Sequence, residues 1–121
     1  MEIKIQRTTT PRKKPDIDGI IFGTHFSDHM FLMDYVEGQG WIDPRIVPYG
    51  PISLEPSAMV FHYAQEIFEG MKAYRTTYGR IQLFRPMENC GRMNVSADRM
   101  CIPRIPEELA LKGLATLLKV D

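Results

Sequence analysis

The chain of 121 residues carries 15 basic and 15 acidic side chains, so its formal net charge is zero, and 44% of its residues are hydrophobic. Such a composition is typical of a globular protein and lacks the basic excess of nucleic-acid-binding proteins. Apolar stretches reach only about four residues, against the roughly 20 that a membrane-spanning helix needs. The two cysteines, Cys90 and Cys101, form no C-x-x-C motif, which excludes a disulfide scaffold and a zinc ribbon. We therefore expect a reduced, cytoplasmic protein without nucleic-acid or membrane partners.

The first 17 residues are predicted to form a solvated arm ahead of a domain that covers residues 18–121. Basic residues dominate residues 1–14, as in a mitochondrial transit peptide, but no apolar segment of a secretory signal follows them. The threonine and proline content of this segment favours a plain arm over a targeting role.

The first half of the domain reads as extended. Alternating apolar residues predict a strand over Phe26–Val36 with both faces buried, and Glu37–Gly40 predicts a turn. Residues 41–52 also read as extended, but three prolines within them predict an edge strand or an ordered loop.

Helical spacing appears further along the chain. An apolar stripe over Val60–Met71 predicts a helix, and Gly70 is placed to end it. A hairpin is expected around Thr77–Gly79, between strands at residues 72–75 and 80–85. Another helix is predicted to begin at Pro86, and a last one at Glu107. The order predicts an α+β domain. Because the last helix runs to Asp121, we also expect a truncated chain.

Several common sites are rejected on spacing. The sequence contains neither phosphate-binding loop motif. His25 and His29 would lie roughly 13 Å apart on a strand, too far for one zinc ion, so hydrogen-bonding roles are predicted for both. Asp28 beside His29 has no serine or cysteine linked to it by spacing. Cys90 and Cys101 are both predicted to be core residues.

Five motifs, in order and without gaps, resemble branched-chain amino acid aminotransferases. HYAQEIFEGMKAY at residues 62–74 carries most of the resemblance, and FGTHFSDHM at 22–30 precedes it. The other three motifs also follow the pattern of this family. They are GW at 40–41 with PRI at 44–46, LFRP at 83–86 with the RM pair at 92–93, and CIP at 101–103. The likeness runs from about residue 5 to the end.

The resemblance implies the small N-terminal domain of the fold type IV (D-amino acid aminotransferase-like) fold, with an antiparallel sheet, flanking helices and no large C-terminal domain. It further implies a homodimeric, pyridoxal 5′-phosphate-dependent transferase of branched-chain amino acid biosynthesis. That enzyme exchanges amino groups between leucine, isoleucine or valine and 2-oxoglutarate. Two alternatives stay open: a D-amino acid aminotransferase or aminodeoxychorismate lyase relative, and a non-catalytic product that only binds or dimerises.

Site residues follow from the motifs. The resemblance makes Arg92 the ligand of the cofactor phosphate, and an arginine fork suits phosphate; otherwise Arg92 would be a surface residue paired with Asp98 or Glu88. It places Phe22, Tyr63 and Phe68 in the substrate pocket, where each could equally be a core residue. No catalytic residue is expected in the chain, because the Schiff-base lysine lies beyond residue 121, and Lys72 is not expected to replace it.

Overall fold

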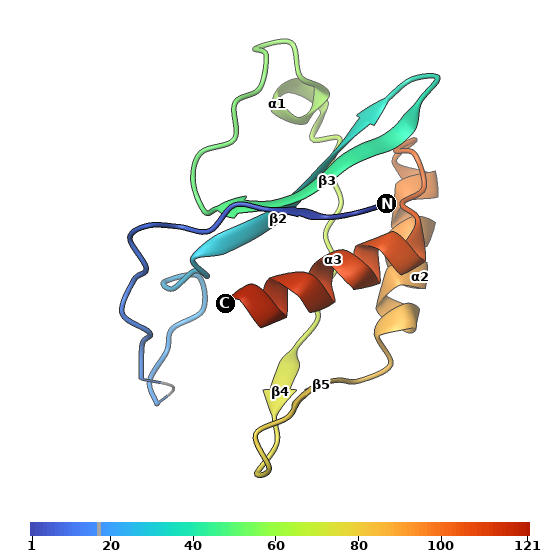
Figure 1. Cartoon of the computed structure of the whole chain (residues 1–121). Coiled ribbons are helices and arrows are strands. Elements are labelled where there is room, and N and C mark those ends of the chain that lie inside the picture. The colour runs from blue at the N-terminus through green and yellow to red at the C-terminus, as the bar shows by residue number, and fades with distance from the viewer. Residues whose placement is uncertain (17) are drawn as a thin grey trace. The chain divides into compact units, whose positions relative to one another are not determined.

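The computed structural model describes residues 1–16 and 18–121, and it has the predicted α+β architecture (Figure 1). In chain order its elements are β1 (Lys4–Ile5), β2 (His29–Val36), β3 (Gly40–Pro48), α1 (Met59–Tyr63), β4 (Ala73–Arg75), β5 (Ile81–Leu83), α2 (Pro86–Arg99) and α3 (Glu107–Val120). The chain forms two compact units. The first comprises residues 1–52 and 112–121, and the second comprises residues 53–111.

The first unit is built on a three-stranded sheet in the order β1-β3-β2 (Figure 1). The predicted strand over Phe26–Val36 is confirmed as β2 from His29 onward, and it pairs antiparallel with β3. β1 pairs parallel with β3, Ile5 lying opposite Ile46. The sheet is therefore mixed, whereas an antiparallel one was expected. Ile46 is fully buried in the middle of β3, but the predicted burial of both faces of β2 is wrong at Asp34 and Tyr35, which are exposed.

β3 is the central strand, so the prediction of an edge strand or loop for this segment is wrong. A bulge explains how a central strand tolerates Pro44: the register shifts so that Asp43 and Pro44 together lie opposite the single residue Met33. Proline has no N–H for the strand ladder, and a bulge leaves one position unpaired. β1 then joins β3 beyond the bulge, beginning at Arg45.

The N-terminal segment is mostly exposed, as predicted, but it is tied to the sheet. Beyond β1, the Thr8 amide donates to His29 Nε2 at 2.9 Å, and the Arg12 amide donates to Asp28 Oδ1 at 3.1 Å. The segment is therefore both exposed to solvent and bonded to residues 28 and 29. Ile17 lies outside the described residues, so the boundary between an arm over 1–17 and a domain over 18–121 stays a prediction.

In the second unit, the predicted helix over Val60–Met71 is wrong beyond Tyr63. α1 ends there because Ala64 adopts a left-handed conformation, with φ 47°. From Gln65 to Lys72 the chain is extended, and partly buried residues alternate with exposed ones. Burial therefore has a period of two, and the helical spacing of the apolar residues does not produce a buried face.

The hairpin and the last two helices agree with prediction. β4 pairs antiparallel with β5 around the turn, α2 begins at Pro86, and α3 begins at Glu107. Cys90 is buried as predicted, but Cys101 is exposed and has a positive φ of 54°, so its core assignment is wrong. The segment after Cys101 is held by the buried Asn94, whose side chain bonds both the amide and the carbonyl of Ile105.

Among the described residues, no helix has the length and apolarity required to cross a bilayer.

Candidate functional site

One face of α2 is polar and opens onto a cleft within the second unit. Glu88, Asn89 and Arg92 follow one another at spacings of one and three residues, which places them along one side of α2, and Arg85 directly precedes the helix. Cys90, Asn94 and Ala97 occupy the opposite, buried side. The packing of that side fixes the helix and thereby aims the polar side into the cleft.

The cleft has a volume of about 350 Å³. Its other wall is the extended segment and the hairpin that continues from it. The lining residues are Gly70, Met71, Lys72, Tyr74, Phe84, Arg85, Glu88, Asn89 and Arg92. Three cations therefore line the cleft with one carboxylate, that of Glu88, and the space suits a small anionic ligand.

Arg92 is held by a carboxylate from the extended segment. Its Nη2 donates to Glu69 Oε1 at 2.6 Å, and its Nε donates to Glu69 Oε2 at 3.2 Å. The side-chain Nδ2 of Asn89 donates to the same Glu69 Oε1 at 2.9 Å and to the Gly70 carbonyl at 2.9 Å. The guanidinium is thus fixed on one side, while the side chain of Arg92 stays 60% exposed.

This pairing changes the acidity of both partners. The hydrogen bond from Arg92, followed by that from Asn89, lowers the pKa of Glu69. The same bond to Glu69 raises the pKa of Arg92. Both groups are therefore charged at neutral pH, and Arg92 can hold a dianion such as a phosphate group through its remaining donors.

Arg92 lies in the cleft, but not with the partners that a surface arginine was expected to have. Asp98 pairs with Arg104 at 2.8 Å, and Glu88 pairs with Arg85 at 3.1 Å. Arg92 forms its ion pair with Glu69 instead, at 2.6 Å.

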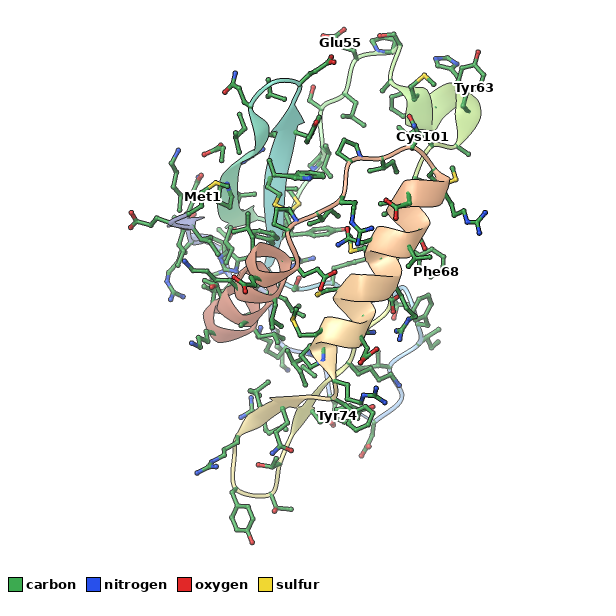
Figure 2. The ribbon with its side chains drawn as sticks, turned by 90° about the vertical axis from the view of Figure 1, so that its right-hand side faces the viewer. Met1, Glu55, Tyr63, Phe68, Tyr74 and Cys101 are labelled. Atoms are coloured by element: carbon green, nitrogen blue, oxygen red, sulfur yellow. The ribbon has the colours of Figure 1, made fainter. Side chains whose placement is uncertain are left out.

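The three predicted substrate residues do not line this cleft. Phe22 lies in the first unit and is fully exposed. Tyr63 and Phe68 belong to the second unit and are 74% and 92% exposed. Figure 2 shows both side chains at the surface, Tyr63 on α1 and Phe68 beside α2. Core roles are therefore excluded for all three, and their pocket roles stay predictions.

Lys72 lines the cleft together with Arg92 and is exposed. A lysine nucleophile is activated by a desolvated site or by a neighbouring cation. That Lys72 does not act as the Schiff-base lysine stays a prediction.

Glu69, Asn89 and Arg85 were missed by sequence reasoning. Asn89 could have been found, because it shares the helical face of Arg92, and Arg85 could have been found because it directly precedes that helix. Glu69 lies 23 residues before Arg92, and only its place in the motif at residues 62–74 could have pointed to it.

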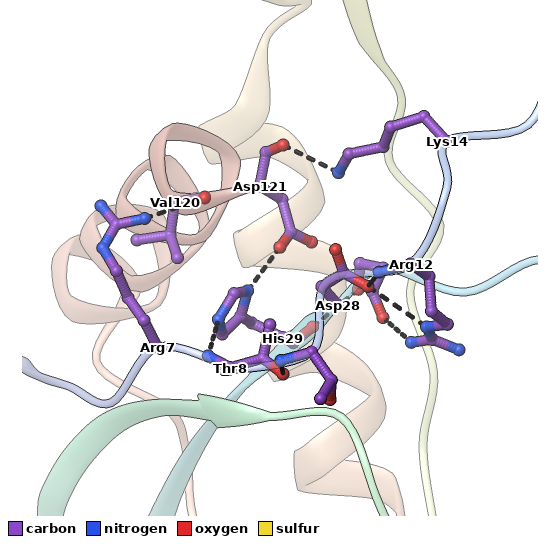
Figure 3. Close-up of polar contacts among 10 residues, drawn as sticks. Arg7, Thr8, Arg12, Lys14, Asp28, His29, Val120 and Asp121 are labelled. Atoms are coloured by element: carbon purple, nitrogen blue, oxygen red, sulfur yellow. Dashed lines mark hydrogen bonds and ion pairs between the residues drawn. The ribbon is translucent and has the colours of Figure 1, made fainter.

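A second polar cluster lies in the first unit (Figure 3). His29 accepts the Thr8 N–H at Nε2 and contacts Asp121 Oδ1 through Nδ1 at 2.6 Å. Because Nε2 accepts, Nδ1 carries the proton and donates it. His25 bonds Thr24 Oγ1, so the predicted hydrogen-bonding roles of both histidines are confirmed. No group of three or more potential metal ligands occurs among residues 1–16 and 18–121.

Comparisons with known proteins show which proteins this chain is similar to. No protein-family model matches the chain. Branched-chain-amino-acid aminotransferase 2 of Bacillus subtilis is 50% identical over 119 residues, which are 98% of this chain and 33% of that protein. The branched-chain-amino-acid aminotransferase of Mycolicibacterium smegmatis is 43% identical over an alignment of 125 residues, which covers the whole of this chain and 34% of that protein. The mitochondrial enzyme of Saccharomyces cerevisiae is 45% identical over 120 residues, 99% of this chain and 30% of that protein. The predicted resemblance is confirmed, and the chain spans about a third of the length of these relatives.

Proposed function

We propose that this chain forms part of a branched-chain-amino-acid aminotransferase and supplies the group that holds the cofactor phosphate. The parent enzyme exchanges amino groups between leucine, isoleucine or valine and 2-oxoglutarate. It is a cytoplasmic, pyridoxal phosphate-dependent homodimer of fold type IV. The observation that carries the proposal is the position of Arg92, which faces a cation-lined cleft within a chain homologous to such aminotransferases.

The donors in the cleft fit a phosphate group. Arg92, Arg85 and Lys72 offer three cations, and the cleft adjoins the first two turns of α2, whose N-terminal end favours anions. Arg92 contributes charge and a fixed direction, since one side of its guanidinium is already bound. Lys72 and Arg85 contribute charge on flexible side chains.

The remaining chemistry belongs to the cofactor and to residues outside this chain. Pyridoxal phosphate, when bound, supplies the electron sink for amino transfer. The resemblance places its covalent lysine outside these 121 residues, so the chain alone is expected to be inactive. We further propose that Phe22, Tyr63 and Phe68 contact the aliphatic side chain of the substrate, because each ring is exposed and free to do so.

A chimeric enzyme tests the proposal. In it, this chain replaces the corresponding 119 residues of the Bacillus subtilis relative. We expect transamination of leucine, isoleucine and valine with 2-oxoglutarate in the chimera, and none with the 121-residue chain alone. Lack of activity in a folded chimera would contradict the proposal.

Cofactor titration of the apo-chimera tests Arg92 directly. Affinity for pyridoxal phosphate should fall from wild type to Arg92→Lys to Arg92→Ala. Bonds to charged groups contribute about 1.5–3 kcal/mol, so the alanine variant should bind roughly tenfold or more weakly. Arg99→Ala is the matched control, because Arg99 is also an exposed arginine of α2 but does not line the cleft. Equal dissociation constants for all four proteins would return Arg92 to a surface role.

A further inference from the structure

We infer that Glu69 is a positioning residue: it locks the guanidinium of Arg92 so that the unused edge of that group receives the phosphate. The inference rests on the proposed function, because it assumes that Arg92 binds this phosphate. Glu69 itself does not touch the anion in this account. It acts through Arg92.

The hydrogen-bond pattern defines which edge remains. A guanidinium has five N–H donors, and Glu69 accepts two of them, one from Nε and one from Nη2. The second N–H of Nη2 and both of Nη1 are left. One N–H of Nη2 and one of Nη1 form a parallel pair at the end of the guanidinium, which is suited to two phosphate oxygens, and the second N–H of Nη1 lies on the remaining side. A phosphate can therefore bind without displacing Glu69.

Burial and additional bonds keep Glu69 in place. Its side chain is 19% exposed, against 60% for Arg92. Asn89 holds Glu69 Oε1 and the Gly70 carbonyl at the same time, so the carboxylate is tied to α2 by a second residue. The lowered pKa of Glu69 keeps it ionised at neutral pH. Removing this carboxylate would leave the exposed guanidinium of Arg92 without the partner that orders it.

The opposite account makes Glu69 a competitor that occupies the phosphate position. The two accounts predict opposite signs for variants of Glu69. A competitor blocks the anion, so its removal tightens binding. A positioning residue removes the cost of ordering Arg92, so its loss weakens binding.

Titration of the 121-residue chain with inorganic phosphate, at constant ionic strength, measures the sign. The readout is the NMR signal of the Arg92 Nε–H, identified by its absence in Arg92→Lys. Glu69→Asp keeps the charge and withdraws the oxygens by one methylene. We expect it to weaken phosphate binding by about twofold to tenfold, the range for losing one ordered side chain. Binding as tight as wild type or tighter would overturn the inference.

Two further variants separate position from charge. Glu88→Gln removes a carboxylate from the same cleft without touching the Glu69–Arg92 bonds, so it should bind phosphate more tightly than wild type. Glu69→Gln removes the same charge and replaces one of the two acceptor oxygens that hold Arg92 with an NH2 donor, so it should bind phosphate more weakly than Glu88→Gln. If Glu69→Asp does not fold, this comparison still decides: equal affinities for the two glutamine variants would overturn the inference. Asp98→Asn, in α2 but outside the cleft lining, should match wild type.

Failure of the inference and failure of the proposed function look different in this titration. If phosphate moves the Arg92 Nε–H signal in wild type, the proposed role of Arg92 stands whatever the variants of Glu69 do. If phosphate leaves the wild-type Arg92 signal unchanged, the proposed function falls and the inference falls with it.

The NMR signal of the Arg92 Nε–H in the absence of phosphate gives a second test of the contact with Glu69. The Nε–H of Arg92 should be protected from exchange in wild type and lose that protection in Glu69→Gln. Because the pKa of Glu69 is lowered in the fold, the contact should persist below the usual glutamate pKa and disappear only as pH falls through the lowered value. Loss of protection at or above the usual glutamate pKa would contradict the lock.

Discussion

Each of the two units contains a carboxylate that accepts a hydrogen bond of 2.6 Å from a side-chain nitrogen, yet the residues that donate these bonds differ in burial. In the first unit, His29 and Asp121 have side chains 5% and 14% exposed. In the second, Glu69 is 19% exposed, close to the value for Asp121, but Arg92 is 60% exposed. A polar group that loses its partner inside a protein costs its full desolvation energy, whereas an exposed group regains water.

The same short contact therefore has different consequences in the two places. The His29 pair joins residues 92 positions apart, and every donor and acceptor of the imidazole is used. The Arg92 pair leaves three donors unused beside a cleft. The first arrangement stabilises the fold, and the second leaves a charged edge available for a ligand. The predictions below test that contrast, beginning with the largest expected effect on stability.

His29→Ala should lower the free energy of unfolding by about 2–3 kcal/mol, because it leaves the Thr8 amide and the Asp121 carboxylate without their part-buried hydrogen-bond partner. Urea denaturation of the 121-residue chain measures this change. His25→Ala is the control: His25 is exposed, so the change should stay within about 0.5 kcal/mol. Equal effects of the two substitutions would break the contrast at its buried end.

Two helical glycines sharpen the contrast further. A Cβ at Gly113 of α3 would lie 2.5 Å from Cε1 and 2.7 Å from Cε2 of Phe31, within the first unit. Gly113→Ala should therefore cost about 1–3 kcal/mol through overpacking. A Cβ at Gly91 of α2 would meet nothing within 4 Å, so Gly91→Ala should stabilise the second unit by about 0.5–1 kcal/mol through helix propensity. Thermal unfolding distinguishes the signs, and a stabilising Gly113→Ala would show that Phe31 moves aside freely.

Phe68→Ala should have the smallest effect on stability. The ring is 92% exposed (Figure 2), so the free energy of unfolding should change by less than about 0.5 kcal/mol, against about 3–5 kcal/mol for a buried phenylalanine. In the chimera the same substitution should raise KM for leucine more than KM for glutamate, since only leucine presents an aliphatic side chain. Equal changes of both KM values would remove Phe68 from the substrate pocket.

Sequence reasoning succeeded where local pattern and tertiary packing agree. α2 begins at its proline and buries the expected Cys90, and the hairpin forms around its glycine turn. It failed where a single backbone angle or a distant partner decides. Ala64 ends α1 with a left-handed angle that nothing in the spacing predicts. The bulge at Asp43–Pro44 admits β3 to the centre of the sheet, and it depends on pairing with β2.

The candidate site was predictable only in part for the same reason. Arg92 followed from the motif, and its helical face was available from spacing. Its partner Glu69 comes from the extended segment that was predicted as helix, where Glu69 and Phe68 would have pointed in other directions. The period-two burial places Glu69 toward α2 and Phe68 toward solvent. An error in one element therefore hid the residue that fixes Arg92.

The split of the first unit between residues 1–52 and 112–121 has a consequence for synthesis on the ribosome. The strands β1, β2 and β3 are translated before the second unit, whereas Gly113, which packs on Phe31, and Asp121, which bonds His29, are translated after it. The second unit is one continuous stretch, residues 53–111, and all of its residues exist before these contacts can form. Closing a loop of such length carries an entropic cost that local contacts do not. During vectorial synthesis, the unit that carries the cleft can therefore complete its own contacts before residues 112–121 are available to the sheet of the first unit.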